Sequence, residues 1–327
     1  MKYEIVDCID AGTEYCPCHL AETGDCILCS ELCNKTFCDC INWKGTCIYQ
    51  EYIWNGNKAK EGRKHQLGKI IDKKKVDNGL IILTIKLSYE LVQSLVHPGS
   101  FIFLRNPSCK EYYDAPISIM DIDTFNNNIT VAIEIVGAKT KKIDELNKDE
   151  DIVVKGPYWN GVLGLRHVLN AKNGNSVIIA RAIGLAPMIP IMKKLCANGN
   201  KVTIILDKAE YKENFVEEYL KLYNVEIIEC CAFSCGELTD SLKNILSKIL
   251  NEKKVNLIHC AGADILIYKV MEYLGEDFNY SCCNNVKMCC GEGICGACTV
   301  RFKGHIVKRL CKLQVDPKYI FEGRRLI

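Results

Sequence analysis

Four cysteines near the C-terminus have the spacing of an iron–sulfur ligand set. Cys290, Cys295, Cys298 and Cys311 follow the pattern C-x4-C-x2-C-x12-C within the run CGEGICGACTVRFKGHIVKRLC. Four thiolates that open with C-x4-C-x2-C suit a [2Fe–2S] centre, and the glycines of this loop let backbone N–H groups approach the sulfurs. We therefore predict that these residues bind a [2Fe–2S] cluster and that the chain carries electrons.

The alternative for these four residues is a structural zinc site or a set of core thiols. Zinc ribbons usually contain two C-x2-C pairs, whereas the first interval here has four residues and is rich in glycine. Neighbouring cysteines leave the ligand identities open, because Cys289 precedes Cys290, and Cys282 and Cys283 lie upstream.

A second group of cysteines fills the N-terminal segment, where nine of the 22 cysteines fall within the first 50 residues. Disulfides are rare in a reducing cytosol, so clustered cysteines in an intracellular chain indicate metal. We expect residues 1–60 to form a Cys-rich head that folds around either a [4Fe–4S] cluster or zinc. The expected ligands are Cys16, Cys18, Cys26, Cys29, Cys38, Cys40 and Cys47. Cys8, Cys33, Cys230 and Cys231 are interpreted as small buried apolar residues.

Composition places the chain among globular proteins of two or three domains. It has 327 residues, 25% charged and 48% hydrophobic, with a formal net charge of +2. This charge favours neither a nucleic-acid partner nor a polybasic membrane anchor. No apolar stretch is long enough for a signal peptide or a membrane span, so we expect a cytoplasmic protein.

Residues 66–168 predict a small antiparallel β-barrel. Short runs rich in β-branched and aromatic residues, such as GLIILTIKL, GSFIFLRN and NNITVAIEIVG, are separated by Gly, Asn and Pro. Several short strands at this spacing are typical of such a barrel. The polar, basic stretch from Asn55 to His65 is interpreted as a linker to the head.

Residues 174–278 predict a Rossmann-like α/β domain with a parallel, doubly wound sheet. The strand-like runs SVIIARAIG, KVTIILDK, VEIIEC and VNLIHCAG alternate with helix-like runs such as LAPMIPIMKKLCANG and DILIYKVMEYLG. Residues 279–327 hold the predicted [2Fe–2S] ligands. The expected fold class is therefore multidomain α+β, with head, barrel, α/β domain and cluster module in that order.

A barrel, an α/β domain and a C-terminal C-x4-C-x2-C-x12-C loop together resemble the electron-transfer subunits of class 1B dihydroorotate dehydrogenase. The chain is also similar to the flavin subunits of NADH-dependent ferredoxin:NADP oxidoreductase and of sulfide dehydrogenase, within the ferredoxin-NADP-reductase-like superfamily. The resemblance covers residues 66–318. It implies a barrel that binds FAD, an α/β domain that binds NAD(P)H, and a [2Fe–2S] cluster that passes electrons to a partner subunit.

The resemblance also implies a flavin site on the barrel. The family's Arg-Pro-hydrophobic-Ser-hydrophobic motif corresponds to the segment 115–119, in which Ala115 replaces the arginine and Asp114 stands nearby. The family's Val-Gly-x-Gly-Thr motif corresponds to 136–140, where Lys139 replaces the second glycine and offers a positive charge to the pyrophosphate. The implied FAD contacts are Pro116, Ile117, Ser118, Ile119, Val136, Gly137, Lys139 and Thr140.

The family's nicotinamide loop, Gly-Gly-Ile-Gly-x-Ala-Pro, corresponds to residues 181–187. Gly184, Ala186 and Pro187 match, while Arg181 and Ala182 stand at the paired glycines. Asp207 ends the next strand, where an acid holds a ribose hydroxyl in nucleotide-binding folds. The family's Cys-Gly-Pro appears as the segment 260–262, Cys-Ala-Gly. The alternative is a scaffold that has lost its nucleotide, because bulk at a tight turn is costly.

The function that these motifs imply is an FAD-dependent NAD(P)H oxidoreductase subunit that is active only with a partner. The flavin would convert hydride transfer into single-electron transfer to the cluster. No side chain is predicted as a catalytic nucleophile or general acid. The expected partner is a larger oxidoreductase subunit or ferredoxin. The alternative is a non-enzymatic redox relay, or a cluster-dependent assembly subunit, with a degenerate nucleotide site.

Overall fold

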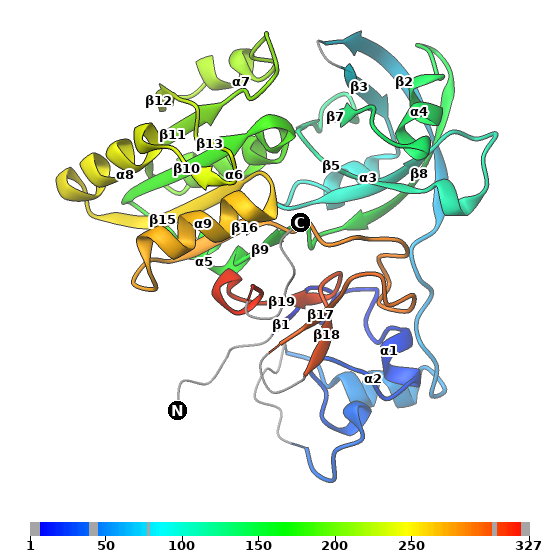
Figure 1. Ribbon diagram of the computed structural model, residues 1–327. Coiled ribbons are helices and arrows are strands. Elements are labelled where there is room, and N and C mark those ends of the chain that lie inside the picture. The colour runs from blue at the N-terminus through cyan, green and yellow to red at the C-terminus, as the bar shows by residue number, and fades with distance from the viewer. Residues whose placement is uncertain (1–6, 39–44, 77–78, 303–305, 322–327) are drawn as a thin grey trace.

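The computed structural model describes residues 7–38, 45–76, 79–302 and 306–321, and two β-sheets dominate it (Figure 1). A curled antiparallel sheet lies beside an α/β sheet, while the N-terminal head lies against the C-terminal module (Figure 1). Cys40 lies outside the described residues, so its predicted ligand role stays a prediction.

The antiparallel sheet is formed by strands that turn their apolar side chains into one interior. Leu83, Ile85 and Val131 are completely buried in its core. Because successive side chains of a strand point to opposite faces, such residues recur at every second position. Within the described residues the strand order is β5 (Ala115–Ser118), β4 (Phe101–Arg105), β8 (Asp151–Tyr158), β2 (His65–Lys75), β3 (Leu80–Lys86), β7 (Asn128–Glu134) and β6 (Asp121–Asp123).

Two short helices cover the ends of this sheet. Helix α3 (Tyr89–Ser94) begins after Ser88, whose side chain accepts a hydrogen bond from the Leu91 N–H at 3.4 Å. Helix α4 (Ala138–Asp144) follows β7. The predicted barrel is confirmed as a curled antiparallel sheet; across the described part of the chain its hydrogen bonds do not close a ring, since β5 and β6 form the two edges.

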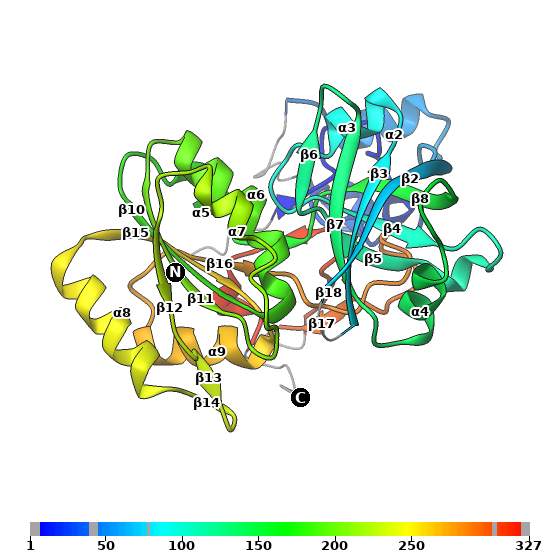
Figure 2. The same cartoon turned by 90° about the horizontal axis from the view of Figure 1, so that it is seen from above.

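The α/β sheet has helices on both faces, as Figure 2 shows. Its strands are almost continuously apolar because both faces are buried, as in β10, where Ile178, Ile179 and Ala180 are inaccessible. For the residues described, the strand order is β12 (Glu226–Glu229), β11 (Lys201–Asp207), β10 (Asn175–Arg181), β15 (Val255–Ala261), β16 (Tyr280–Cys283) and β9 (Val162–Leu163).

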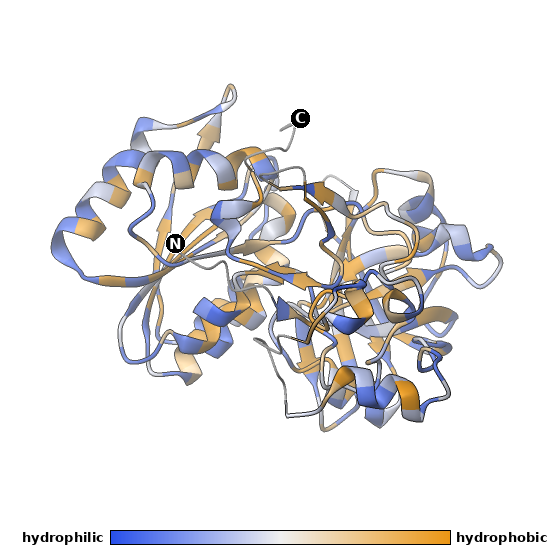
Figure 3. Ribbon diagram, turned by 90° about the horizontal axis from the view of Figure 1, so that it is seen from below, coloured by the Kyte–Doolittle hydropathy of each residue, from blue (hydrophilic) through white to orange (hydrophobic). Residues whose placement is uncertain are grey.

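Helices α5 (Leu165–Asn170), α6 (Leu185–Ala197) and α7 (Glu217–Lys221) pack on one face of this sheet. Helices α8 (Asp240–Glu252) and α9 (Asp264–Leu274) pack on the other. A small hairpin, β13 (Phe233–Ser234) and β14 (Glu237–Leu238), precedes α8. Figure 3 shows apolar residues concentrated on the strands and polar residues on the outer helix faces. The doubly wound arrangement is thus confirmed.

One strand departs from the predicted all-parallel sheet. Strand β9 leaves the antiparallel sheet and pairs antiparallel with β16, so that Leu163 lies opposite Cys282. A two-residue strand carries no periodic pattern, so the sequence gives no sign of it. The two sheets are joined further by ion pairing of Lys193 with Asp121 and by a hydrogen bond from the Tyr211 hydroxyl to the carboxylate of Glu134.

A short strand of the N-terminal head pairs with a short strand of the C-terminal module. Strand β1 (Asp7–Cys8) pairs antiparallel with β19 (Leu313–Gln314), so the head is attached to the C-terminal module. The head continues through α1 (His19–Glu22), the 3-10 turn η1 (Glu31–Cys33) and α2 (Ile48–Trp54); the module contains β17 (Thr299–Arg301), β18 (Val307–Arg309) and the 3-10 turn η6 (Pro317–Tyr319). None of the helices that the structure describes is long and apolar enough to cross a bilayer.

Candidate functional site

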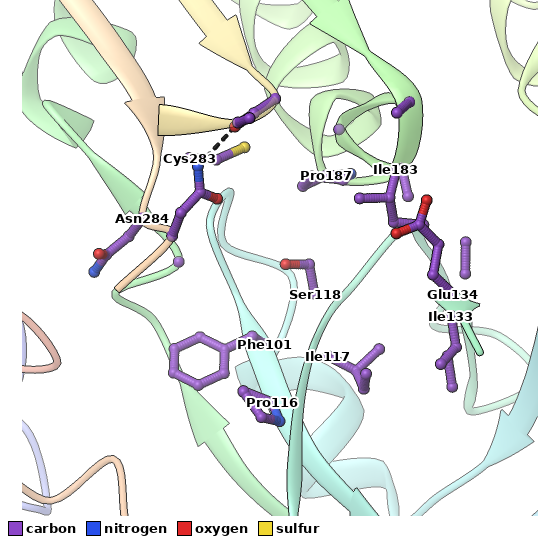
Figure 4. A pocket seen from close by; sticks show the side chains of 18 of the residues that line it. Phe101, Pro116, Ile117, Ser118, Ile133, Glu134, Ile183, Pro187, Cys283 and Asn284 are labelled. Atoms are coloured by element: carbon purple, nitrogen blue, oxygen red, sulfur yellow. Dashed lines mark hydrogen bonds between the residues drawn. The ribbon is translucent and has the colours of Figure 1, made fainter. Parts of the chain in front are cut away.

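A cavity of about 600 Å³ lies between the two sheets (Figure 4). Its volume falls within the range of small-molecule and cofactor sites. One wall comes from the antiparallel sheet and includes Phe101 and Ser118; the other comes from the start of α6 and from the loops after β15 and β16. The cavity therefore has the position that a ligand shared by both sheets requires.

The predicted flavin residues divide into those that reach this cavity and those that do not. Pro116, Ile117, Ser118 and Thr140 line it, and the Ser118 hydroxyl points into the open space (Figure 4). Ile119 is instead buried in the core of the antiparallel sheet.

Three further predicted flavin residues, Val136, Gly137 and Lys139, are absent from the cavity lining. Val136 is exposed, and its N–H donates to the Thr140 hydroxyl at 3.1 Å. A side chain at Gly137 would meet open space. The role of this segment toward a ligand stays a prediction.

Asp114, beside the position where the family motif has arginine, is surrounded by basic side chains. Its carboxylate is 2.9 Å from Arg105 Nε and 2.9 Å from His65 Nε2, and Lys139 Nζ donates to its carbonyl at 2.7 Å. Arg105 ends β4, next to β5, whose Ala115 pairs with Leu104. An arginine of the neighbouring strand β4, Arg105, thus brings a positive charge close to the start of β5. Arg105 was not predicted as a site residue, although the run GSFIFLRN already indicated a strand that ends near it.

The turn after β10 forms the opposite wall of the cavity. Gly184 has no room for a side chain, because a Cβ there would lie 2.3 Å from the carbonyl oxygen of Ala261. Ala186 and Pro187 follow in the first turn of α6 and also line the cavity. The N-terminus of a helix favours anions through its free N–H groups, so a phosphate group suits this wall.

Asp207, the predicted ribose acid, is engaged by the protein itself. Its carboxylate accepts hydrogen bonds from Arg181 Nε at 3.0 Å and from the backbone N–H groups of Ala209 and Ala232, both at 2.8 Å. It lines a second cavity, of about 490 Å³, together with Arg181 and Cys230. A ribose would therefore compete with Arg181 for this carboxylate.

Three of the four C-terminal cysteines lie close together. Cys298 and Cys311 are buried against Phe101, Phe103 and Tyr158. A hydrogen bond between their side chains lowers the pKa of Cys298 to about 6, and Cys311 also interacts electrostatically with Cys290. The Glu292 N–H donates to the Cys290 sulfur at 3.3 Å, as expected for backbone groups that surround a cluster.

The remaining predicted ligand, Cys295, is exposed, and its loop is held from two sides. Gly291 has φ +70°, and a Cβ there would lie 2.4 Å from the Tyr158 ring. Gly293 has φ +80°, and a Cβ there would lie 3.1 Å from Leu20 of the head. The glycines thus allow both a left-handed backbone and close packing.

Some cysteines of the head lie together around one cavity, and the others lie outside it. Cys16, Cys18 and Cys26 line one small cavity together with Cys8, which was expected to be a small buried apolar residue and is half-buried. Cys29 lies next to this group, with its N–H 3.4 Å from the Cys26 sulfur.

The other cysteines of interest lie outside that cavity. Cys38, Cys47 and Cys231 are exposed, so the expectation that Cys231 is buried was wrong; Cys33 and Cys230 are half-buried. In the described ranges, no three His, Cys, Asp or Glu side chains are already arranged to hold a single ion.

Four charged side chains lie between the head and the C-terminal loop, and the sequence analysis did not anticipate them. Arg63 is 2.8 Å from Asp10 and 3.2 Å from Glu292. Lys312 is 2.8 Å from Glu292 and also pairs with Asp10. Burial alone would lower the pKa of Lys312, but the two carboxylates raise it above its usual value. All four groups are therefore charged and paired.

No protein-family model matches the chain. It is 30% identical to the dihydroorotate dehydrogenase B (NAD(+)) electron transfer subunit of Clostridium acetobutylicum over 254 residues, which cover 76% of this chain and 93% of that protein. A protein of Methanocaldococcus jannaschii described as probably the same subunit is 30% identical over 236 residues, 70% of this chain and 80% of its own.

Among solved structures, the chain is similar to one from a study of NADH-dependent reduced ferredoxin-NADP oxidoreductase. The TM-score is 0.62 at 21% identity, with 75% of this chain and 86% of that chain covered. At this identity the likeness shows the fold.

Proposed function

The chain belongs to the family of dihydroorotate dehydrogenase B electron transfer subunits, and from this premise we propose that it transfers electrons between NAD(P)H and a partner protein through FAD and a [2Fe–2S] cluster. The observation that carries the proposal is the cavity between the sheets. It has the flavin-motif residue Ser118 on one wall and the turn at Gly184 on the other. FAD would supply the exchange between two-electron and one-electron transfer.

The residues of the antiparallel sheet fit a flavin ring. Phe101, Pro116 and Ile117 offer an apolar surface, while the Ser118 hydroxyl can both donate and accept hydrogen bonds. The basic side chains of Arg105 and Lys139, held around Asp114, stand near the same strand end. These residues would bind and orient the group, and the apolar wall would exclude water from it.

The residues of the α/β sheet fit a dinucleotide. The N-terminus of α6 offers N–H groups to a phosphate, and Gly184 keeps the turn tight against Ala261. Arg181 lines both the main cavity and the second one, so its guanidinium is placed to meet a phosphate with charge-assisted hydrogen bonds.

The position of the C-terminal cysteines suits a cluster that passes electrons from the flavin to the partner protein. Cys298 and Cys311 pack against Phe101, which also lines the cavity, so this ligand pair is adjacent to the proposed flavin site. Cys295 and the neighbouring Ile294 are exposed on the opposite part of the loop. A larger oxidoreductase subunit or ferredoxin would dock over this exposed side.

A second function remains open because of one observation. Arg181 occupies a glycine position of the family loop and holds Asp207 at 3.0 Å. This arrangement favours a redox relay that has a flavin and a cluster but no nucleotide site.

Anaerobic titration of the purified full-length chain tests both functions. The proposed function predicts that bound flavin is bleached promptly by NADH or NADPH. Bleaching by dithionite but by neither nucleotide would support the relay, and a protein that retains no FAD after reconstitution would overturn the proposed flavin site.

A further inference from the structure

We propose that Cys8, Cys16, Cys18 and Cys26 form a four-thiolate metal centre in the head, separate from the C-terminal cysteines. The inference concerns a site that the proposed function does not require, since that function uses the cavity between the two sheets and the C-terminal cysteines. Its chemistry is thiolate ligation of a soft or borderline metal, as zinc or as an iron–sulfur cluster.

The four thiols share one enclosed space. They line a cavity of about 20 Å³ whose other walls include the apolar side chains of Leu20, Ile27 and Leu28. The sulfurs also interact electrostatically, Cys18 with both Cys8 and Cys16, and Cys26 with both Cys16 and Cys18. Four cysteine side chains that face one apolar cavity meet the ligand count of a tetrathiolate site.

The ligand set differs from the one that sequence spacing suggests. Cys38 and Cys47 are exposed and lie outside the cavity, and Cys29 and Cys33 do not line it. Cys8 takes their place because β1 pairs with β19 and thereby fixes Cys8 opposite Leu313. The pairing of β1 with β19, which are far apart in sequence, therefore adds Cys8 to the three nearby cysteines Cys16, Cys18 and Cys26.

The head also needs a stabiliser other than an apolar core. Among its described residues from 7 to 60, the buried apolar side chains are Pro17, Leu20, Ala21 and Leu32. Segments of this size rarely fold on so small a core without metal or disulfides. Cys8, Cys16, Cys18 and Cys26 form no disulfide, and metal ligation would supply the missing stability.

The centre would lie next to the C-terminal cysteines. The Ile9 N–H donates to the Lys312 carbonyl at 2.9 Å, and Cys311 precedes Lys312. Pairing of Cys8 with Leu313 keeps the Cα atoms of Cys8 and Cys311 within about 13 Å. The Lys312 side chain interacts with both Cys18 and Cys311. An iron–sulfur cluster here would extend the electron path, and zinc would fasten the head over the C-terminal loop.

Metal analysis of the full-length chain, purified without oxygen, tests this centre. We compare the wild type with Cys8→Ser and Cys16→Ser, with Cys38→Ser as the control for an exposed cysteine of the same head. Both cavity variants should lose the same metal content, while Cys38→Ser keeps it. Loss of zinc identifies a zinc centre, and loss of iron with sulfide identifies an iron–sulfur cluster.

A second measurement covers variants that fail to fold. Native wild-type protein is alkylated with iodoacetamide, before and after treatment with a chelator, and each cysteine is quantified by mass spectrometry. The four cavity cysteines should become reactive only after metal removal, whereas Cys38 and Cys47 react throughout. Full metal content in Cys8→Ser, or equal alkylation of Cys8 with and without chelator, would overturn the proposal.

Discussion

Arg63 and Asp10 form a buried ion pair, with Arg63 Nη2 2.8 Å from Asp10 Oδ1. Their side chains are 1% and 2% exposed, and Arg63 also lies over the Tyr15 ring, 4.0 Å from its centroid. Because Glu292 and Lys312 complete the same group, the head is attached to the C-terminal loop by charges that water does not screen. Without Arg63, the two buried carboxylates of Asp10 and Glu292 would share the single ammonium group of Lys312, which leaves one buried negative charge uncompensated.

Replacing Arg63 by methionine should therefore destabilise the protein by about 3–5 kcal/mol. The neighbouring Lys64 provides a matched control, since its ion pair with Glu61 is almost fully exposed; Lys64→Met should change stability by less than about 1 kcal/mol. Thermal unfolding monitored by circular dichroism, with limited proteolysis of the head, measures both variants. Equal stability of the two variants would contradict a structural role for the buried pair.

Gly291 should be essential for the C-terminal centre, in contrast to Gly296 of the same loop. Both have positive φ, +70° and +74°, but a Cβ at Gly291 would collide with Tyr158, while one at Gly296 would meet its nearest atom at 3.7 Å. In both alanine variants the positive φ costs about 1 kcal/mol of backbone strain. Gly291→Ala has in addition the steric clash of its Cβ with the Tyr158 ring. We expect Gly291→Ala to lose cluster iron and Gly296→Ala to keep most of it, as iron analysis and EPR of the reduced protein would show.

The sequence predicted those parts of the fold that local patterns encode. Runs such as that around Ile179 in β10 are short and continuously apolar, as is typical of strands buried on both faces, and the structure contains them. The position of Cys8 could not be predicted in this way, because its partner Leu313 lies at the other end of the chain. For the same reason the pairing of Arg63 with Glu292 has no local signal.

Residues of the candidate site could be predicted only where a short sequence motif itself determines the local backbone structure. Ser118 and Gly184 line the cavity, because each is positioned by its own strand or tight turn; their contacts with a cofactor stay predictions. The basic side chains around Asp114 could not be predicted from the sequence, because Arg105 comes from the adjacent strand. Alternation along one strand says which face a side chain takes, not which side chain of the next strand it meets.

Ser118→Ala should slow reduction of the proposed flavin without removing it. The hydroxyl lies on the cavity wall (Figure 4), and loss of one hydrogen bond typically costs about 0.5–1.5 kcal/mol, roughly 2- to 12-fold in rate. Stopped-flow measurement of flavin bleaching by NADH gives this rate, and Ser247→Ala, on the exposed side of α8, serves as control. An unchanged rate in Ser118→Ala would place the flavin elsewhere.

Arg181→Ala should weaken nucleotide binding. If its guanidinium meets a phosphate, loss of a charge-assisted hydrogen bond of about 1.5–3 kcal/mol raises KM for NADH at least tenfold with kcat unchanged. Steady-state kinetics of flavin reduction against the exposed control Arg166→Ala separates the two constants. A lower KM in Arg181→Ala would show that the side chain obstructs the nucleotide.

His259 should make stability depend on pH. Burial lowers its pKa to about 3, and its Nδ1 lies 2.8 Å from the Ser281 hydroxyl. The unfolded chain binds a proton below about pH 6.5 that the folded protein does not accept. Its contribution to stability is therefore complete above pH 6.5 and is lost as the pH falls.

Between pH 6.5 and 5, this residue should account for a loss of about 2 kcal/mol, which His259→Gln would abolish. Thermal unfolding across this range, compared with the exposed His97→Gln, checks the prediction. Identical pH profiles for wild type and His259→Gln would contradict it.

Pairing of β1 with β19 affects the order of events during synthesis. Asp10 is made 302 residues before Lys312, an interval of about 15–60 s at usual translation rates. Throughout that time the head lacks both the strand that fixes Cys8 and the ammonium group beside Cys18. The head can therefore reach its final packing only after the strand Leu313–Gln314 has been made.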